Sequence, residues 1–364
     1  MVMVNLYLEE AALFEAGVEA FYGTMRLRFT VLINNLHIPS SVFIKVPQLG
    51  EWFVIGTKLQ YFQKERYMYE TILPLLQKNW RAEKFSPHFY GSTKSGVLVI
   101  ENLREFGLYT LEEPQDKMVT CIQVFKSLAQ FHALSVAYVD EFNYETLDLL
   151  TVRNRSYFEG KEYDLQVTLL KFLERVRPLF SEDIEKELAF LGDNLLTIVN
   201  EAYSPNENGL NVILHGEMSW MSVFFQNDKQ NNVVHCKFVD FINSRRGSPV
   251  IDLVNYLLTS VQFEVYRVYG NKLFQFYVEE LKKAVDASGT DIQSLYGLNE
   301  LYADLQKYKH FFVFQLIFYV PQYWNFRSNY FAQNEEDTSK YDLLMKSEDY
   351  ITFFKSWIEV IILW

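Results

Sequence analysis

Hydrophobic and polar residues alternate in the N-terminal part of the chain, as they do in half-buried β-strands. Residues 24–34 show this alternation, and residues 41–47 show it again after the polar turn of residues 34–40. Two strands joined by a polar turn predict a hairpin. Residues 86–103 predict a second hairpin, which closes with the apolar strand of residues 97–100.

A helix is predicted between these two hairpins, over residues 58–77. Its apolar side chains recur near the 3.6-residue period of an α-helix. They are Leu59, Phe62, Tyr69, Ile72 and Leu73. Because proline lacks the N–H that a helix interior needs, Pro74 is expected to end the regular part of this helix.

Helical periodicity dominates after Leu103. Apolar side chains at residues 118–136 advance in steps of four and three, which predicts a long amphipathic helix. Residues 184–198 repeat this pattern behind Ser181 and an acidic first turn. Both features favour a helix N-terminus, since serine caps free N–H groups and acidic side chains complement the helix dipole.

Residues 252–364 are nearly all helical in pattern, with breaks expected near residues 288–289 and at Pro321. Among the helices lies one island of short strands, at residues 211–242. The predicted fold class is therefore α+β, with a small sheet-rich N-terminal part and a larger helical part. We place their boundary near residues 101–105. A chain of 364 residues exceeds what one hydrophobic core usually organises, which also favours two lobes.

The charge balance disfavours polyanionic partners. The chain has 34 Lys plus Arg against 46 Asp plus Glu, a net charge of -12. Such an acidic protein repels nucleic acid and anionic membrane surfaces, so we expect neither as a general partner. Aromatic residues make up 17% of the chain and predict a bulky core.

The cysteine count and the apolar tracts indicate a soluble protein in a reducing compartment. Cys121 and Cys236 are too few for a disulfide framework or a cysteine-based zinc site, so a cytoplasmic location is expected. The N-terminus lacks the basic region and cleavage site of a signal peptide. The most apolar tract, residues 310–324, is too short to span a bilayer and predicts a buried helix.

Lys45 is the first candidate for chemistry, because it stands in the middle of an apolar strand. A buried ammonium group needs a partner, and Glu65 lies on the following helix. A strand lysine paired with a helix glutamate is how kinase-like folds hold the phosphates of a nucleotide. The alternative is that Lys45 extends to solvent and Glu65 is an ordinary surface charge.

Residues 211–242 contain two further acidic side chains at the ends of predicted strands. His215-Gly216-Glu217 follows one apolar strand, and Asp240 directly follows another. An aspartate at a strand exit can bind Mg²⁺ between phosphates, while the other acid orients a substrate hydroxyl. Alternatively, Asp240 is a turn residue and Glu217 a surface acid. The order of Lys45, Glu65, Glu217 and Asp240 along the chain favours phosphoryl transfer.

These segments resemble the ecdysteroid kinase-like (CHK kinase-like) family, relatives of choline kinases and aminoglycoside phosphotransferases. The similarity extends over roughly residues 17–330, and its last segment is the most specific. The segments that carry it are FIKVP (43–47), FQKERYMYETILP (62–74), VIENL (99–103), SLAQFHALS (127–135), LHGE (214–217) and FVDFINSRRGSPVIDLVNYLLTS (238–260). The resemblance implies a two-lobed protein-kinase-like fold, with residues 1–102 as the nucleotide-binding lobe. Residues 103–364 would form a helical lobe with the catalytic loop and the acceptor site.

The resemblance also implies ATP and Mg²⁺ as cofactors and a small-molecule alcohol, such as a steroid, as acceptor. By position, Lys45 would contact the α- and β-phosphates and Glu65 would orient Lys45. The backbone of Glu101, Asn102 and Leu103 would form the adenine-binding hinge.

In the helical lobe, the resemblance gives His215 a supporting role in the catalytic loop. Glu217 would take the catalytic-acid position and Asp240 would bind Mg²⁺. Asp252 is expected to support the lobe and not to react.

The catalytic loop departs from the family pattern of His-Gly-Asp with Asn five residues later. Glu217 replaces the Asp and Ser222 replaces the Asn. The extra methylene moves the carboxylate by about an ångström, which can lower the rate roughly 100-fold. The Ser222 hydroxyl can bind Mg²⁺ but reaches less far than an asparagine amide. Two functions stay open: a phosphotransferase with a divergent loop, and a pseudokinase that binds a nucleotide or a lipophilic ligand.

Three other features carry less weight. The segment that would cover the nucleotide has only Gly17 and Gly23, which is poor support for a backbone phosphate cradle. A metal site of His215, Glu217, His235 and Cys236 matches no zinc spacing. A serine hydrolase is disfavoured because no G-x-S-x-G motif occurs in the chain.

Overall fold

The structure is a computed structural model, and it describes residues 4–14, 22–33, 36–47, 61–78, 84–112, 117–137, 162–287, 296–325 and 347–364. The described residues form two compact units. The first unit contains those up to Thr110 together with Ser222–Ser244, and the second contains the others from Leu111 onward. The prediction instead divides the chain once, into lobes of residues 1–102 and 103–364, and so assigns Ser222–Ser244 to the helical lobe. That division stays a prediction.

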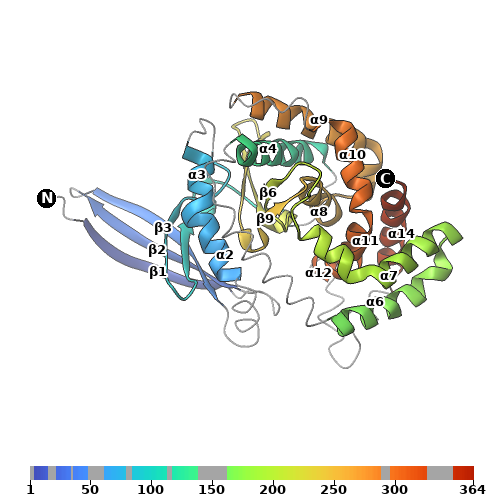
Figure 1. Cartoon of the computed structure of the whole chain (residues 1–364). Coiled ribbons are helices and arrows are strands. Elements are labelled where there is room, and N and C mark those ends of the chain that lie inside the picture. Colours follow the sequence, from blue (N-terminus) through green and yellow to red (C-terminus); the bar gives the residue numbers. More distant parts are fainter. Residues whose placement is uncertain are drawn as a thin grey trace. The chain divides into compact units, whose positions relative to one another are not determined.

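Helices and antiparallel strands coexist in the chain, which confirms the predicted α+β class (Figure 1). The first unit holds a five-stranded sheet whose neighbouring strands all pair antiparallel, in the order β1-β2-β3-β5-β4. Its strands are β1 (Val4–Phe14), β2 (Tyr22–Ile33), β3 (Leu36–Pro47), β4 (Phe89–Ser92) and β5 (Leu98–Glu101). In β5, Leu98 and Ile100 are buried and the residues between and after them are less so, as alternation requires.

Two features of this sheet differ from the sequence-based prediction. The predicted turn at residues 34–40 is mostly strand, because β3 begins at Leu36 and Pro39 pairs opposite Thr30. The second edge of β3 pairs with β5 only at residues 42–45, and a strand tolerates proline where one edge has no ladder partner. The strand β1 was not predicted, since a register shift between Leu8 and Glu10 breaks its alternation.

The predicted helix of residues 58–77 is present from residue 61, but Pro74 does not end it. It consists of α2 (Tyr61–Tyr67), a π-helical turn (Met68–Ile72) and α3 (Leu73–Lys78). In the wide turn, the N–H of Leu73 donates to the carbonyl of Met68, five residues back. Proline cannot donate to the carbonyl four residues before it, and the π-turn changes the hydrogen-bonding pattern just where that donor is missing.

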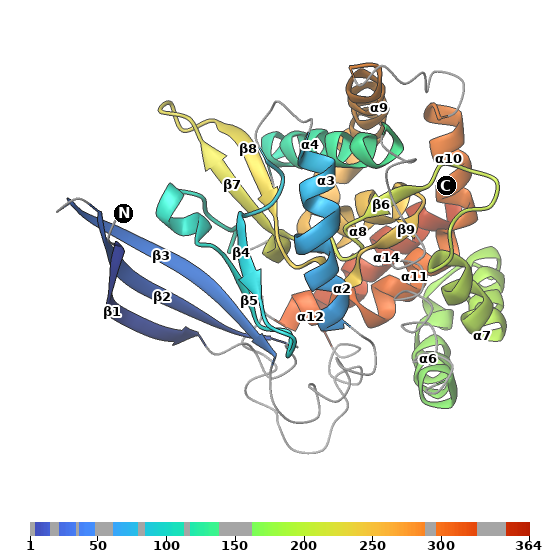
Figure 2. The same cartoon turned by 60° about the vertical axis from the view of Figure 1, so that its left-hand side comes forward.

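A hairpin completes the first unit (Figure 2). It pairs β7 (Val223–Asn227) with β8 (Val233–Phe238). The N–H of Phe238 donates to the carbonyl of Phe85 at 2.6 Å, and the N–H of Val239 donates to the carbonyl of Ser222 at 3.0 Å. These bonds fix the end of β8, just before Asp240.

The second unit is built around the helix α8, all of whose residues are buried. α4 lies along α9, and α11 packs against α7, α8 and α14 (Figures 1 and 2). The described helices are α4 (Met118–Ala137), α6 (Glu162–Val176), α7 (Glu182–Ala202), α8 (Val250–Ser260), α9 (Phe263–Asp286), α10 (Leu298–Lys307), α11 (Lys309–Phe318), α12 (Val320–Asn325) and α14 (Glu348–Leu363). A two-stranded antiparallel sheet joins β6 (Val212–Leu214) to β9 (Arg245–Gly247).

The helices expected at residues 118–136 and 184–198 are confirmed as α4 and α7. Ser181 stands at the N-cap of α7, although its side chain makes no capping hydrogen bond. The helix α6 was not predicted. The predicted single strand island is in fact two sheets, because β6 pairs with β9 and β7 pairs with β8.

The break predicted near Pro321 is present at Tyr319, since α11 ends at Phe318 and α12 starts at Val320, with Pro321 in its first turn. The break expected near residues 288–289 lies outside the described residues. The apolar tract that starts at residue 310 forms buried α11, as predicted. Within the described ranges, every helix is too short or too polar to cross a bilayer.

Candidate functional site

Lys45 is held by two carboxylates in the first unit. Its Nζ donates to Glu65 Oε1 at 2.7 Å, to Glu65 Oε2 at 2.9 Å and to Asp240 Oδ1 at 2.7 Å. Glu65 on α2 is fully buried, and the side chain of Lys45 on β3 is 9% exposed. Asp240 differs, because 47% of its side chain is exposed. The pairing expected of a strand lysine and a helix glutamate is present, and we call these three residues the Lys45 cluster.

The electrostatics of the Lys45 cluster keep the lysine charged. Burial alone would lower the pKa of Lys45, but the negative charges and hydrogen bonds of Asp240 and Glu65 outweigh it and raise the pKa. Tyr69 lies beside the cluster, with its ring edge-to-face on Phe241 at 5.6 Å. Burial, with the charges of Glu65 and Asp240, raises the pKa of Tyr69 well above its usual range. The lysine is thus a permanent cation with its counter-charges in place.

Asp240 has an uncommon backbone conformation. Its φ of 74° and ψ of 61° lie in the left-handed region, which aspartate tolerates better than most side chains. The next residue, Phe241, donates its N–H to Glu65 Oε1 at 3.3 Å. The bend therefore lets one short segment present Asp240 to Lys45 and a backbone donor to Glu65.

The predicted hinge residues follow one another at the end of β5. The carboxylate of Glu101 accepts from Lys237 Nζ at 2.9 Å and from the N–H of His88 at 3.1 Å. Asn102 caps a short 3₁₀ helix, and its Nδ2 donates to Ser41 Oγ at 2.8 Å.

The hinge backbone is partly occupied. The carbonyl of Leu103 accepts from the N–H of Leu108 at 3.2 Å, and the carbonyl of Arg104 accepts from the N–H of Gly107 at 3.2 Å. No acceptor for the N–H of Leu103 is found among the described residues. It is one backbone donor of this segment without an acceptor there, and the hinge role stays a prediction.

Ser222 and Asp240 come together at one end of the β7–β8 hairpin. Ser222 directly precedes β7, and its carbonyl accepts from the N–H of Val239, next to Asp240. Carboxylate and hydroxyl oxygens are hard ligands that suit Mg²⁺, which takes most of its remaining ligands from water and phosphates. The two residues fit such an ion as a partial ligand set. Over the described part of the chain, no three His, Cys, Asp or Glu side chains gather as a metal site.

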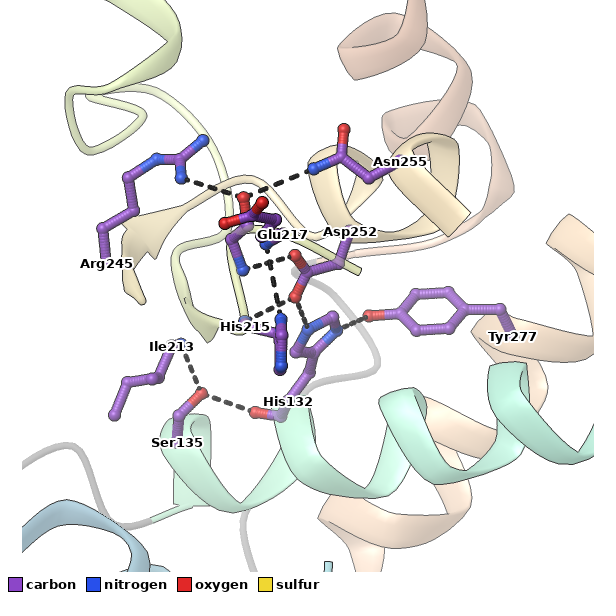
Figure 3. A network of polar contacts seen from close by, with 10 residues as sticks. His132, Ser135, Ile213, His215, Glu217, Arg245, Asp252, Asn255 and Tyr277 are labelled. Carbon is purple, nitrogen blue, oxygen red and sulfur yellow. Dashed lines mark hydrogen bonds and ion pairs between the residues drawn. The ribbon is translucent and has the colours of Figure 1, made fainter. Parts of the chain in front are cut away.

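A second group of polar residues surrounds Asp252 in the second unit (Figure 3). Asp252 Oδ2 accepts from the N–H of His215 at 2.7 Å, and Oδ1 accepts from the N–H of Gly216 at 2.8 Å. The same Oδ2 lies 3.2 Å from Nε2 of His132, whose Nδ1 lies 2.8 Å from the hydroxyl of Tyr277. One buried carboxylate thereby ties the loop of residues 215–217 to α4 and α9.

The charge of Asp252 is stabilised where it lies. Burial raises the pKa of Asp252, but the hydrogen bond and charge of His132, with His215 and the N–H of Gly216, lower it by more. Burial also raises the pKa of Tyr277 well above its usual range, so its hydroxyl stays protonated. The hydroxyl of Tyr277 therefore keeps its proton at its 2.8 Å contact with His132 Nδ1.

The loop that carries Glu217 is fixed at several backbone atoms. Gly216 has a φ of 86°, which glycine adopts without strain. Its carbonyl accepts from Asn255 Nδ2 at 3.4 Å and from Arg245 at 3.5 Å, and Figure 3 shows these two side chains converging on it. The N–H of Glu217 points to His215 Nδ1 at 3.4 Å, and the hydroxyl of Tyr323 donates to Glu217 Oε1 at 3.4 Å.

Several residues of this second group were not predicted as site residues from the sequence. They are His132, Arg245, Asn255, Tyr277 and Tyr323. One signal was available for two of them: a histidine on an apolar helix face and an arginine beside an apolar strand both need buried partners. Their partners lie far away in sequence, so spacing could not reveal them.

The other residues considered in the sequence analysis do not join either of these two groups. Gly17 lies outside the described residues, and Gly23 pairs opposite Val46 within the sheet. His235 lies in the first unit, where its Nε2 is 3.1 Å from the carbonyl of Lys84, and Cys236 is buried and forms no disulfide. A metal site of His215, Glu217, His235 and Cys236, already disfavoured by its spacing, is not found among the described residues.

The family profile decides what kind of chain this is. The profile of the ecdysteroid kinase-like family matches residues 20–290, which is well over half of the sequence. The chain belongs to the ecdysteroid kinase-like family. This match confirms both the resemblance drawn from the sequence and the predicted kinase-like fold. A search of curated proteins gives no match. As a family member, the chain is kinase-like and belongs with small-molecule phosphotransferases in general.

Proposed function

We propose that this protein is an ATP-dependent phosphotransferase that moves the γ-phosphoryl group to an alcohol hydroxyl of a small molecule. The observation that carries the proposal is Lys45 held by Glu65 and Asp240 in a member of a kinase-like family. Kinases hold nucleotide phosphates with a lysine and a metal-binding aspartate in this arrangement. The family name supports a steroid or another lipophilic alcohol as the acceptor.

On the nucleotide side, Lys45 would contact the α- and β-phosphates, and Glu65 would keep its ammonium group in place. The N–H of Leu103 would donate to the adenine ring. Asp240 and Ser222 would hold Mg²⁺. When bound, the ion supplies neutralisation of the phosphate charge during transfer.

On the acceptor side, Glu217 would accept the hydrogen bond of the acceptor hydroxyl. The hydroxyl oxygen forms a bond to the γ-phosphorus while the bond from that phosphorus to the β,γ-bridging oxygen breaks. The hydroxyl proton goes to Glu217 and ADP leaves. His215 supports this loop, because its N–H is fixed by Asp252.

The alternative function is a pseudokinase that binds a nucleotide or a lipophilic ligand without transfer. The departures at Glu217 and Ser222 support it, since both fall on the transfer step. Lys45, Glu65 and Asp240 would serve either function. Binding and turnover therefore need separate experiments.

Binding is tested by thermal unfolding with MgATP. A ligand that binds the folded state at 100 times its Kd stabilises by about 2.7 kcal/mol, so millimolar MgATP is expected to raise the Tm. Asp240→Ala should abolish most of this shift. Asp193→Ala, at an exposed position on α7, is the matched control and should keep it. No shift in the native chain, or an equal shift in Asp240→Ala, would refute the nucleotide site.

Turnover is tested by comparing the native chain with a Glu217→Asp, Ser222→Asn double variant across candidate alcohols. ADP release that requires an alcohol in the native chain supports the phosphotransferase. Turnover in the double variant alone would establish the pseudokinase. We also propose a cytoplasmic location, which the buried Cys121 and Cys236, neither of them in a disulfide, support.

A further inference from the structure

Glu217 has a hydrogen-bonding partner that its sequence context does not reveal. Tyr323 on α12 donates its hydroxyl to Glu217 Oε1 at 3.4 Å. The hydroxyl of Tyr319, one helical turn earlier in the sequence, lies 3.1 Å from that of Tyr323. A hydroxyl has one proton, so when Tyr323 donates to Glu217 its oxygen can accept from Tyr319. The three groups can thus form a chain of donors that ends on the carboxylate.

The tyrosine is well placed to hold this position. Tyr323 is buried, and its ring packs against that of Tyr319 with centroids 5.3 Å apart. Tyrosine has only two side-chain torsions, so a packed ring directs its hydroxyl in a defined way. The packing therefore fixes the donor before any ligand binds.

The backbone that leads into Glu217 is fixed independently of the tyrosine. Asp252 accepts from the N–H groups of His215 and Gly216, and Asn255 donates to the carbonyl of Gly216. A glutamate on a fixed backbone still has three torsions, and its carboxylate can sweep a wide arc. A second contact at the carboxylate is needed to select one position.

The length of the side chain matters for this contact. The distance of 3.4 Å is already near the upper limit for a hydrogen bond. An aspartate on the same backbone would withdraw the carboxylate by about an ångström and would lose the hydrogen bond from Tyr323. Glutamate and Tyr323 thus form a matched pair.

We propose that Tyr323 is a positioning residue that holds the Glu217 carboxylate where an acceptor hydroxyl meets it. Tyr319 supports this role through the hydroxyl of Tyr323. The pair compensates for the longer acid in the catalytic loop. This inference rests on the proposed phosphotransferase function, because an acceptor hydroxyl is what the carboxylate would meet.

Turnover in a double-mutant cycle tests the proposal. Tyr323→Phe keeps the ring and removes the hydroxyl, and should lower kcat about tenfold with the KM for ATP unchanged. In a Glu217→Asp background, where the contact is already lost, the same change should alter kcat less than about twofold. Tyr302→Phe removes a hydroxyl that donates to Asn271, far from the loop in sequence, and is the matched control.

An equal loss in both backgrounds would overturn the proposal, because a merely structural tyrosine would act without regard to residue 217. A higher kcat in Glu217→Asp with Tyr323 intact would also overturn it. A native chain without turnover refutes the proposed function instead. Crystal structures of the native chain and Tyr323→Phe then decide the positioning role: displacement of the Glu217 carboxylate supports it, and an unchanged carboxylate overturns it.

Discussion

Replacing Asp252 with asparagine is expected to loosen the loop that carries Glu217. The carboxylate accepts two backbone N–H groups and faces His132 Nε2, all in a fully buried position. Asn keeps the shape and one oxygen, but it puts an NH₂ group against one of these donors and removes the charge. The donors of His215 and Gly216 then compete for a single acceptor.

The size of the effect follows from these contacts. A buried donor left without a partner costs about 1–3 kcal/mol, and breaking a buried charge pair costs about 3–5 kcal/mol. Because the amide oxygen of Asn keeps one bond, we expect a loss of about 3 kcal/mol. At 1.36 kcal/mol for each factor of ten, this corresponds to roughly 100-fold faster opening of the loop.

Hydrogen exchange followed by mass spectrometry measures this opening directly. Peptides that contain residues 212–218 should exchange roughly 100-fold faster in Asp252→Asn than in the native chain. Asp193→Asn, an exposed change of the same chemistry on α7, should leave them unchanged. Native exchange rates in Asp252→Asn would refute the reasoning, since the buried carboxylate would then hold nothing in place.

The effect should also depend on pH in one direction. The pKa of Asp252 is lower in the folded chain than in the unfolded one, where it is about 3.9. Its contribution to stability is therefore fully present above that value and is lost as the pH falls through the folded pKa. The native chain and Asp252→Asn should converge in stability only in that acidic range.

Three further outcomes are expected. Asp240→Asn should weaken the binding of MgATP but strengthen the binding of metal-free ATP about tenfold, as measured by calorimetry in EDTA. The reason is that the change removes a negative charge that competes with phosphates for Lys45. Weaker binding of both forms of ATP would contradict this. Lys237→Met should lower stability by about 2 kcal/mol, since its ion pair with Glu101 is mostly buried, and the charge swap Glu101→Lys, Lys237→Glu should recover at least half of it in urea unfolding. If the charge swap recovers no stability, the ion pair between Lys237 and Glu101 does not stabilise the fold. Gly96→Ala should lower stability by about 2 kcal/mol in the same assay, because φ is +90° and a Cβ would lie 2.9 Å from a side-chain carbon of α2; an unchanged midpoint would contradict it.

The sequence was sufficient for the features that repeat along the chain. Alternation located the strand of Lys45, and helical periodicity located α4 and α7. The pairing of Lys45 with Glu65 was also predictable, since a buried ammonium group demands a carboxylate and few were near. Periodicity and burial arguments were sufficient for these elements because the residues of one segment determine them.

The sequence was insufficient where one residue changes a local pattern. A bulge in β1 hid that strand, and the π-turn before Pro74 let the helix continue where proline normally ends it. The contacts of Asp252 and Tyr323 join residues tens to more than a hundred positions apart, and nothing in their spacing indicates them. Tertiary packing, which the pattern of one segment does not contain, decides such contacts.

The buried carboxylate of Asp252 changes how related sequences should be read. Because it holds the backbone of residues 215 and 216, selection for folding alone would keep it in a chain that has lost its chemistry. The presence of this aspartate and of the His-Gly pair that it anchors therefore indicates the fold and does not indicate activity. Evidence that a lineage still transfers phosphate must come from positions that folding does not need. Residues 217 and 222 and the hydroxyl of Tyr323 are where such evidence would accumulate.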